Sequence, residues 1–149
     1  MRIRMEPVGY VRNDIKLPKD HGWANEESQI VLQEHLVPAL SGLGGFSHLL
    51  VVFWMHQAKP STAWQRRPQG RDDMPEVGLF AQRSKHRPNP IGITAVKLVR
   101  VIDNELSVRG LDAIDGTPVL DIKPYYPAYD CRHEAQVPDW VDRLMADYF

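Results

Sequence analysis

Between Val77 and Gly92 the chain reads V-G-L-F-A-Q-R-S-K-H-R-P-N-P-I-G. The apolar start of this stretch leads into a basic segment, and a second apolar run begins at Ile91. Pro88 and Pro90 fit neither a central strand nor a helix interior, because proline lacks the amide donor that both structures use. We therefore predict a stiff loop between two strands, with cationic side chains held on a rigid frame.

Apolar and β-branched runs recur along the chain and predict a mainly β protein. The run F-S-H-L-L-V-V-F-W-M-H at 46–56 is apolar on both alternating faces, which predicts a central strand buried on both sides. Strands at 92–102 and 105–111 are expected to be joined by a two-residue turn at Asp103-Asn104. The other predicted strands are 3–11, 28–36, 77–81 and a short run within 112–123. Closure of about six or seven strands into a small barrel would remove their exposed edges.

Two helical elements complete the predicted fold. Residues 37–43 resemble one helical turn, with Pro38 near its start and Gly42 after it. Apolar residues at helical spacing predict a C-terminal amphipathic helix over 138–149. These residues are Trp140, Val141, Leu144, Met145 and Tyr148. We expect one domain spanning 1–149, a small single-domain β-barrel with short helical elements and a C-terminal helix.

Composition is that of an ordinary globular protein. The chain has 149 residues, of which 43% are hydrophobic and 25% charged. No apolar run approaches the roughly 20 residues that span a bilayer, and the N-terminus lacks the apolar core of a signal peptide. We therefore expect a cytoplasmic protein without a membrane partner. The single cysteine, Cys131, excludes an intrachain disulfide.

Charge is unevenly distributed along the chain. The net charge is −1, but residues 66–87 carry six Lys or Arg against three Asp or Glu, a local charge of +3. A basic patch on a nearly neutral protein suits a phosphate-bearing partner.

Several common site motifs are missing. A dinucleotide site needs Gly-x-Gly-x-x-Gly between a strand and a helix. The segment Gly42-Leu43-Gly44-Gly45 lacks the third glycine and precedes a predicted strand. There is no Walker loop and no Gly-x-Ser-x-Gly elbow. Residues 130–133 offer one thiol and one imidazole, too few for a zinc site, so we expect no metal.

Two long motifs carry a family resemblance. The segments G-L-F-A-Q-R-S-K-H-R-P-N-P-I-G (78–92) and L-D-A-I-D-G-T-P-V-L-D-I-K-P (111–124) resemble the TsaA-like family. The segment F-S-H-L (46–49) and His56-Gln57 fit it as well, and the resemblance is strongest over 7–130. Well-described members are S-adenosylmethionine-dependent methyltransferases that act on N6 of threonylcarbamoyladenosine at position 37 of tRNA. The resemblance implies a small β-barrel, a homodimer with S-adenosyl-L-methionine near its interface, and tRNA as substrate.

The resemblance also implies site residues. The donor would contact Pro18, Lys19, His56, Gln57, Arg83, Ile93, Leu111, Asp112, Ala113, Ile114, Asp115, Gly116 and Thr117. In the first loop the family pattern Pro-Arg-Gln is replaced by Pro18-Lys19-Asp20. The RNA substrate would contact Arg66, Arg67, Lys85, Arg87 and Asn89.

Chemistry suggests roles for some of these groups. Arg83 can pair with the donor's carboxylate, and Arg87 with the acceptor or its phosphates. Backbone groups of 112–117 can hydrogen-bond the adenine or ribose, with Gly116 allowing close approach. No catalytic residue is assigned, because His86 and the acceptor's own carboxylate are both candidate bases. Two alternatives remain open, a non-catalytic module that binds S-adenosylmethionine or RNA, and a methyltransferase for small molecules.

Overall fold

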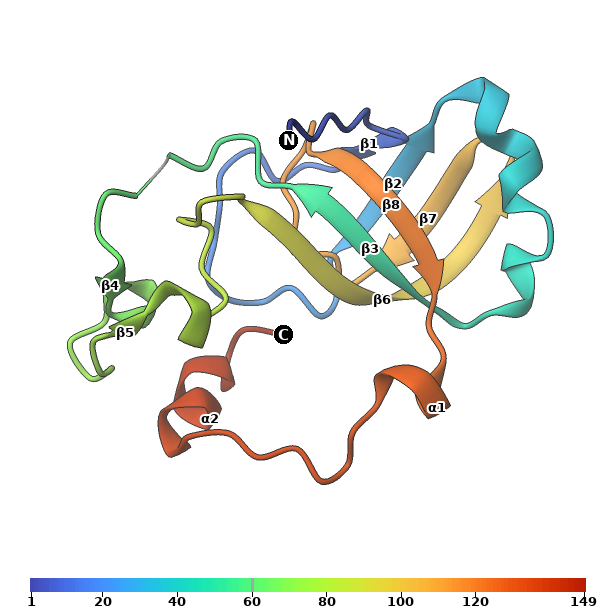
Figure 1. Cartoon of the computed structure of the whole chain (residues 1–149). Coiled ribbons are helices and arrows are strands. Elements are labelled where there is room, and N and C mark those ends of the chain that lie inside the picture. The colour runs from blue at the N-terminus through green and yellow to red at the C-terminus, as the bar shows by residue number, and fades with distance from the viewer. Residues whose placement is uncertain (60) are drawn as a thin grey trace.

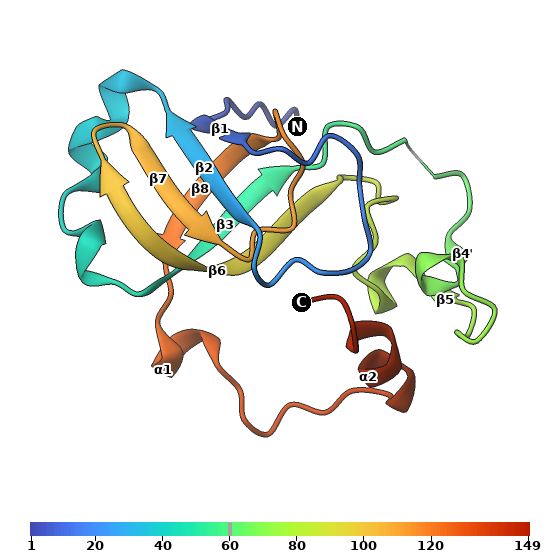
Figure 2. The ribbon, with the colours of Figure 1, turned by 180° about the vertical axis from the view of Figure 1, so that it is seen from behind.

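In the computed structural model, which describes residues 1–59 and 61–149, six antiparallel strands close into a barrel (Figure 1). They are β1 (Gly9–Arg12), β2 (Glu27–Leu32), β3 (His48–Trp54), β6 (Ile91–Ile102), β7 (Glu105–Arg109) and β8 (Pro118–Pro124). Their order around the barrel is β1-β2-β7-β6-β3-β8. Figure 2 shows the wall made by β2, β7 and β6 from the other side. The predicted fold class, a small β-barrel with few helices, is confirmed.

The remaining elements lie between or after the barrel strands. A two-stranded hairpin pairs β4 (Gln65–Arg66) with β5 (Val77–Gly78), and we call residues 61–90, which contain it, the lobe. The short 3-10 helices are η1 (Glu34–Leu40), η2 (Leu43–Gly45), η3 (Pro68–Gly70) and η4 (Leu79–Ala81). The α-helices are α1 (Pro127–Asp130) and α2 (Asp139–Met145), and α2 lies beside the lobe (Figure 1). Within the described residues, no helix has the length and apolarity to span a bilayer.

The core fills the barrel interior. Alternate residues of each strand point inward, as the pleat requires. The buried cluster consists of Val11, Ile30, Leu32, Leu49, Val51, Phe53, Val96, Leu106, Val108, Leu111, Ala113 and Val119. The prediction that β3 is buried on both sides is wrong. Leu50, Val52 and Trp54 are only partly covered, because the second face of a barrel strand lies on the outside.

Several predicted boundaries also need correction. The strand predicted at 77–81 stops at Gly78 and continues as the 3-10 turn η4. The first strand begins at Gly9, after the Pro7 that disfavours regular pairing. The second ends at Leu32, and the helical turn expected at 37–43 begins earlier, as η1. The C-terminal helix forms as predicted but ends at Met145, before Tyr148.

Gly9 allows β1 to close the barrel. This strand pairs with β2 on one side and with β8 on the other, where Gly9 lies opposite Leu32 and Val119. A Cβ atom at Gly9 would lie 2.4 Å from the Val31 carbonyl oxygen and 2.9 Å from the Leu32 Cα. Both obstacles are backbone atoms, which cannot move without disturbing the β1–β2 ladder.

We expect Gly9→Ala to lower the free energy of unfolding by about 1–3 kcal/mol, the usual cost of overpacking. Gly44→Ala is the matched control, since an added Cβ there has no atom within 4 Å. The control should change stability by less than about 0.5 kcal/mol. Urea denaturation of both variants measures the difference, and equal stabilities would contradict the close-approach argument.

Candidate functional site

The ladder between β6 and β7 leaves half of β6 open. It begins with Lys97 opposite Arg109, whereas β3 pairs with β6 from Ile91 to Lys97 on the other side. After Arg109 the chain turns away at Gly110, whose φ is 86°. Among the residues that the structure describes, 91–96 therefore have no strand partner on that edge. We call this opening between 91–96 and 110–114 the seam.

Polar side chains bridge the seam. The Thr94 hydroxyl donates to Asp112 Oδ1, and the Tyr148 hydroxyl donates to Asp112 Oδ2 at 2.6 Å. At the same place Arg83 Nη2 donates to the Ile93 carbonyl at 2.5 Å. Residues far apart in sequence thus meet at one edge of the barrel, and three of them, Arg83, Ile93 and Asp112, were predicted from the sequence to bind the donor.

Tyr148 remains protonated in this setting. Its burial and the neighbouring negative charge of Asp112 raise the pKa of the phenol far above its usual value. Asp20 raises this pKa further and Arg83 opposes the rise, so both charges lie near the hydroxyl. The phenol is therefore a hydrogen-bond donor to Asp112 throughout the physiological pH range.

The first long loop packs against the same region. Trp23 is buried, at 2% exposure, and its indole N–H donates to the Lys19 carbonyl at 3.2 Å. The Lys19 ammonium lies 4.8 Å from the Trp23 ring centroid and pairs with Glu26. Lys19 thus braces its own loop with its ammonium group, while the neighbouring Pro18 is exposed.

Most side chains of the segment 111–117 point into the protein. The side chains of Leu111, Ala113, Ile114 and Thr117 are buried, with exposures of 8% or less. Across residues 1–59 and 61–149, the main-chain groups of Leu111 and Asp112 form no hydrogen bond with another segment. Backbone donors and acceptors are therefore free at the point where the segment borders the seam.

The second half of this segment faces β1 instead. Asp115 accepts hydrogen bonds from Lys16 Nζ at 2.7 Å and from the Asn13 amide at 3.0 Å, and both lower the pKa of its carboxyl. The Gly116 amide donates to the Val11 carbonyl at 2.8 Å. The structure thus separates Asp112, at the seam, from Asp115, which fastens the turn to the start of the loop that follows β1.

His56 and Gln57 are exposed just beyond the end of β3. The lobe approaches this point, because the Met55 amide donates to the Pro90 carbonyl at 2.8 Å. His86 Nδ1 lies 3.1 Å from the Lys59 carbonyl. A carbonyl only accepts, so Nδ1 carries the proton and Nε2 of the neutral ring retains its lone pair.

The predicted RNA-contacting cations fall into two groups. Arg87 Nη1 donates to the carbonyls of Leu79, at 3.1 Å, and Gln82, at 2.6 Å, and Arg67 donates to the Met74 carbonyl. These two guanidinium groups hold the lobe together. Arg66, Lys85 and Asn89 are exposed on the lobe surface, and Arg67 is exposed as well despite its bond to Met74.

Sequence reasoning missed four residues. Trp64 and Phe80 are 66% and 85% exposed on the lobe, although large aromatic side chains are usually buried for the most part. Thr94 and Tyr148 complete the Asp112 network. Of the four, only Phe80 could have been suspected from the sequence, because it lies within the basic motif. Thr94 and Tyr148 lie in patterns that are typical of a strand and of a helix, and these patterns do not indicate a functional role.

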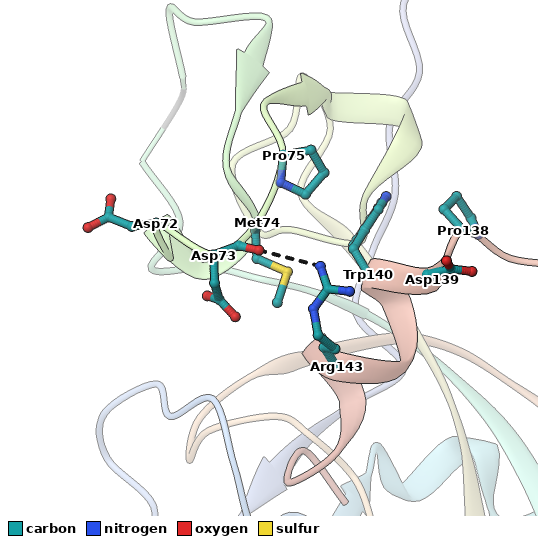
Figure 3. A pocket seen from close by; sticks show the side chains of 8 residues that line it. All are labelled: Asp72, Asp73, Met74, Pro75, Pro138, Asp139, Trp140 and Arg143. Atoms are coloured by element: carbon teal, nitrogen blue, oxygen red, sulfur yellow. Dashed lines mark hydrogen bonds between the residues drawn. The ribbon is translucent and has the colours of Figure 1, made fainter.

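A groove lies between the lobe and α2 (Figure 3). Arg143 Nη2 on α2 donates to the Asp73 carbonyl at 3.5 Å, and Arg71 pairs with the Asp73 carboxylate at 2.6 Å. This ion pair lowers the pKa of Asp73 and raises that of Arg71. The Arg143 contact fastens α2 to the lobe and thereby places the residues that follow α2.

A second hollow lies on the outside of β1, β2 and β7. It is lined by Arg12, Asn13, Asp14, Glu27, Ser28, Gln29, Arg100, Ser107 and Asp115. Neither hollow includes the seam, and Asp115 is the one predicted donor residue that lines either of them. In the described part of the chain, no group of three or more His, Cys, Asp or Glu could hold a metal ion.

Known proteins match both the sequence and the fold. A probable S-adenosyl-L-methionine-binding protein of Methanothermobacter thermautotrophicus is 40% identical over 134 residues, 87% of this chain and 95% of the relative. The tRNA (adenine(37)-N6)-methyltransferase of Escherichia coli is 36% identical over 84% of this chain and 58% of its own length. The crystal structure of TrmO from Pseudomonas aeruginosa superposes with a TM-score of 0.73 at 31% identity, covering 93% of this chain and 63% of that chain.

The family profile gives the most direct assignment. Residues 10–131 match the tRNA-methyltransferase O N-terminal domain, and this range contains the barrel strands apart from Gly9 of β1, the lobe and the seam. The chain therefore belongs to the tRNA-methyltransferase O N-terminal domain family.

Proposed function

We propose that the protein transfers the methyl group of S-adenosyl-L-methionine to N6 of adenine 37 in tRNA, with threonylcarbamoyladenosine as the modified base. The single observation that carries the proposal is the seam. There Arg83, from one family motif, bonds the Ile93 carbonyl of β6, and the next residue of β6, Thr94, bonds Asp112 from the other motif. Relatives named for this reaction, or for binding this donor, support the assignment.

The seam suits the donor's chemistry. Arg83 uses one nitrogen on the Ile93 carbonyl and keeps further donors for the donor's carboxylate. The main-chain groups of Leu111 and Asp112 can hydrogen-bond the adenine, which presents both donors and acceptors. In this proposal the entrance to the donor site is lined by Pro18, from the loop after β1, and by His56 and Gln57, from the loop after β3.

Methyl transfer is an in-line displacement. The N6 lone pair attacks the methyl carbon, the sulfur–carbon bond breaks, and the sulfonium becomes a neutral thioether as the N6 proton leaves. The reacting atoms must be held close and nearly collinear, with water excluded. Two groups can accept the proton, the His86 Nε2 lone pair and the carboxylate of the threonylcarbamoyl group.

The exposed surface of the lobe is the proposed RNA contact. Arg66 and Lys85 supply charge for phosphates, and Asn89 supplies amide hydrogen bonds. Trp64 and Phe80 offer faces on which unpaired bases can stack, the usual mode of recognition for single-stranded loops. A tRNA substrate would place the enzyme in the cytoplasm.

We further propose a homodimer built on the outer face of β3 and β6. Val52 lies opposite Ile93 in the ladder and Trp54 opposite Ile91, which forms a continuous apolar strip with Leu50. Ile91 and Ile93 are 37% and 45% exposed in the single chain. Since Ile93 also borders the seam, a second copy on this face would add a wall beside the donor.

Calorimetric titration with the donor, followed by incubation of labelled donor with tRNA carrying threonylcarbamoyladenosine, tests the function. We expect saturable binding and transfer of label to tRNA, with none to tRNA carrying unmodified adenine 37. Binding without transfer would favour the non-catalytic module. Label on a small acceptor but not on tRNA would favour a small-molecule methyltransferase, and absence of binding at millimolar donor would refute the proposal.

Arg83 and Lys85 should separate donor binding from RNA binding. We expect Arg83→Ala to weaken donor binding by about 1.5–3 kcal/mol, because a charge-assisted hydrogen bond is lost. Lys85→Ala should leave donor affinity unchanged while weakening tRNA binding and making it less dependent on salt. Arg87→Ala should instead lower the melting temperature, since Arg87 bonds two lobe carbonyls. Equal losses of donor affinity in Arg83→Ala and Lys85→Ala would contradict this division.

The dimer is tested by placing a charge on the apolar strip. Val52→Glu should shift the protein from dimer to monomer in sedimentation velocity, because an unpaired carboxylate would be buried in the interface. Ile102→Glu is the control, since Ile102 is exposed at the far end of the same strand β6. A wild-type monomer, or dimers in both variants, would refute this interface.

A further inference from the structure

The segment after α2 is fastened beside the seam. The Gly22 amide donates to the Asp147 carbonyl at 2.9 Å, and the Trp23 amide donates to the Tyr148 carbonyl at 3.0 Å. Trp23 is itself buried, at 2% exposure, so these bonds tie the segment after α2 to a fixed part of the first long loop. Residues 146–149 therefore run along the first long loop with a defined register, which fixes the direction of the Tyr148 side chain.

Tyr148 reaches across to the second family motif. Its hydroxyl donates to Asp112 Oδ2 at 2.6 Å, while the Thr94 hydroxyl donates to Asp112 Oδ1. Both carboxylate oxygens are thus held from opposite sides, one by the barrel wall and one by the segment after α2. A carboxylate gripped at both oxygens fixes its own main chain, and this main chain borders the seam.

The remaining groups around Tyr148 strengthen this arrangement. The Phe149 ring packs edge-on at 5.0 Å between ring centroids. The charges of Asp20 and Arg83 also act on the hydroxyl, which places the first loop and the proposed carboxylate-binding arginine near one phenol. Packing of the Tyr148 ring on its neighbour Phe149 does not by itself require a hydroxyl aimed at Asp112.

We propose that Tyr148 is a positioning residue for the methyl donor: it holds Asp112 so that the main-chain groups of 111–112 face the bound donor across the seam. Tyr148 does not contact the reacting atoms and acts through Asp112. This inference rests on the proposed function, because it takes the seam as the donor site. The inference adds Tyr148 to the site, a residue that lies outside the range 10–131 matched by the family model.

The test removes only the hydroxyl. We expect Tyr148→Phe to weaken donor binding about tenfold, equivalent to about 1.4 kcal/mol, measured by calorimetry. In methyl transfer the KM for the donor should rise by a similar factor, while kcat at saturating donor stays within about twofold. This pattern is expected when the lost interaction stabilises the bound donor and the transition state equally. Tyr129→Phe is the matched control, since Tyr129 is 76% exposed and the same atom is removed. The control should leave both constants unchanged.

A double-mutant cycle separates positioning from simple structural support. Asp112→Ala removes the acceptor that Tyr148 holds, so adding Tyr148→Phe to Asp112→Ala should change donor affinity by less than about twofold. An undiminished tenfold effect in that background would mean that Tyr148 acts by another route and would overturn the inference. Unchanged affinity in Tyr148→Phe alone would overturn it as well.

Two further outcomes are informative. Tighter donor binding in Tyr148→Ala would mean that the ring competes with the donor, which contradicts positioning. If the wild-type protein binds no donor, the proposed function fails first, whereas wild-type binding with an unaffected Tyr148→Phe rejects only the inference. Melting temperatures without donor, compared between wild type and Tyr148→Phe, identify any general loss of folded structure.

Discussion

The unequal lengths of β6 and β7 are the constraint on which the site depends. β6 has 12 residues and β7 has 5, and their ladder begins only at Lys97. Among the described residues, the first half of β6 is therefore paired with a strand on one edge alone, although in a closed barrel both edges of each strand are normally paired. The side chains of Thr94 and Asp112 join the two sides of this opening, and the arginine of the basic motif caps a β6 carbonyl beside them.

Much of the fold could be predicted from the sequence. β-Branched residues identified β6, period-two alternation identified β7, and Asp103-Asn104 predicted the turn between them, where Asp103 adopts a φ of 51°. The run at 46–56 identified β3 but could not show that one face of the strand is partly exposed. An apolar face looks the same in the sequence whether it contacts the core, solvent or another subunit. Prolines marked the lobe as irregular without revealing the small hairpin inside it.

The site was only partly predictable, for a physical reason. The two motifs pointed to Arg83 and Asp112, yet a sequence does not show which hydrogen-bonding groups are already used within the fold. Lys19 stacks on Trp23 and pairs with Glu26, and Arg87 bonds carbonyls of its own lobe. Tyr148 meets Asp112 across 36 residues through a segment whose pattern suggested only an amphipathic helix. Such long-range side-chain pairs carry no local periodicity.

The position of β1 has a consequence for how the chain folds. Gly9 pairs with Val119, so the barrel cannot close until strands near both ends of the sequence have come together. Closing a loop of this length costs conformational entropy before its contacts form, and topologies rich in such distant pairings fold slowly. The hairpin of β6 and β7 needs only a two-residue loop and can form early. During synthesis β1 leaves the ribosome long before β8 exists, and its outer edge must remain unpaired until then.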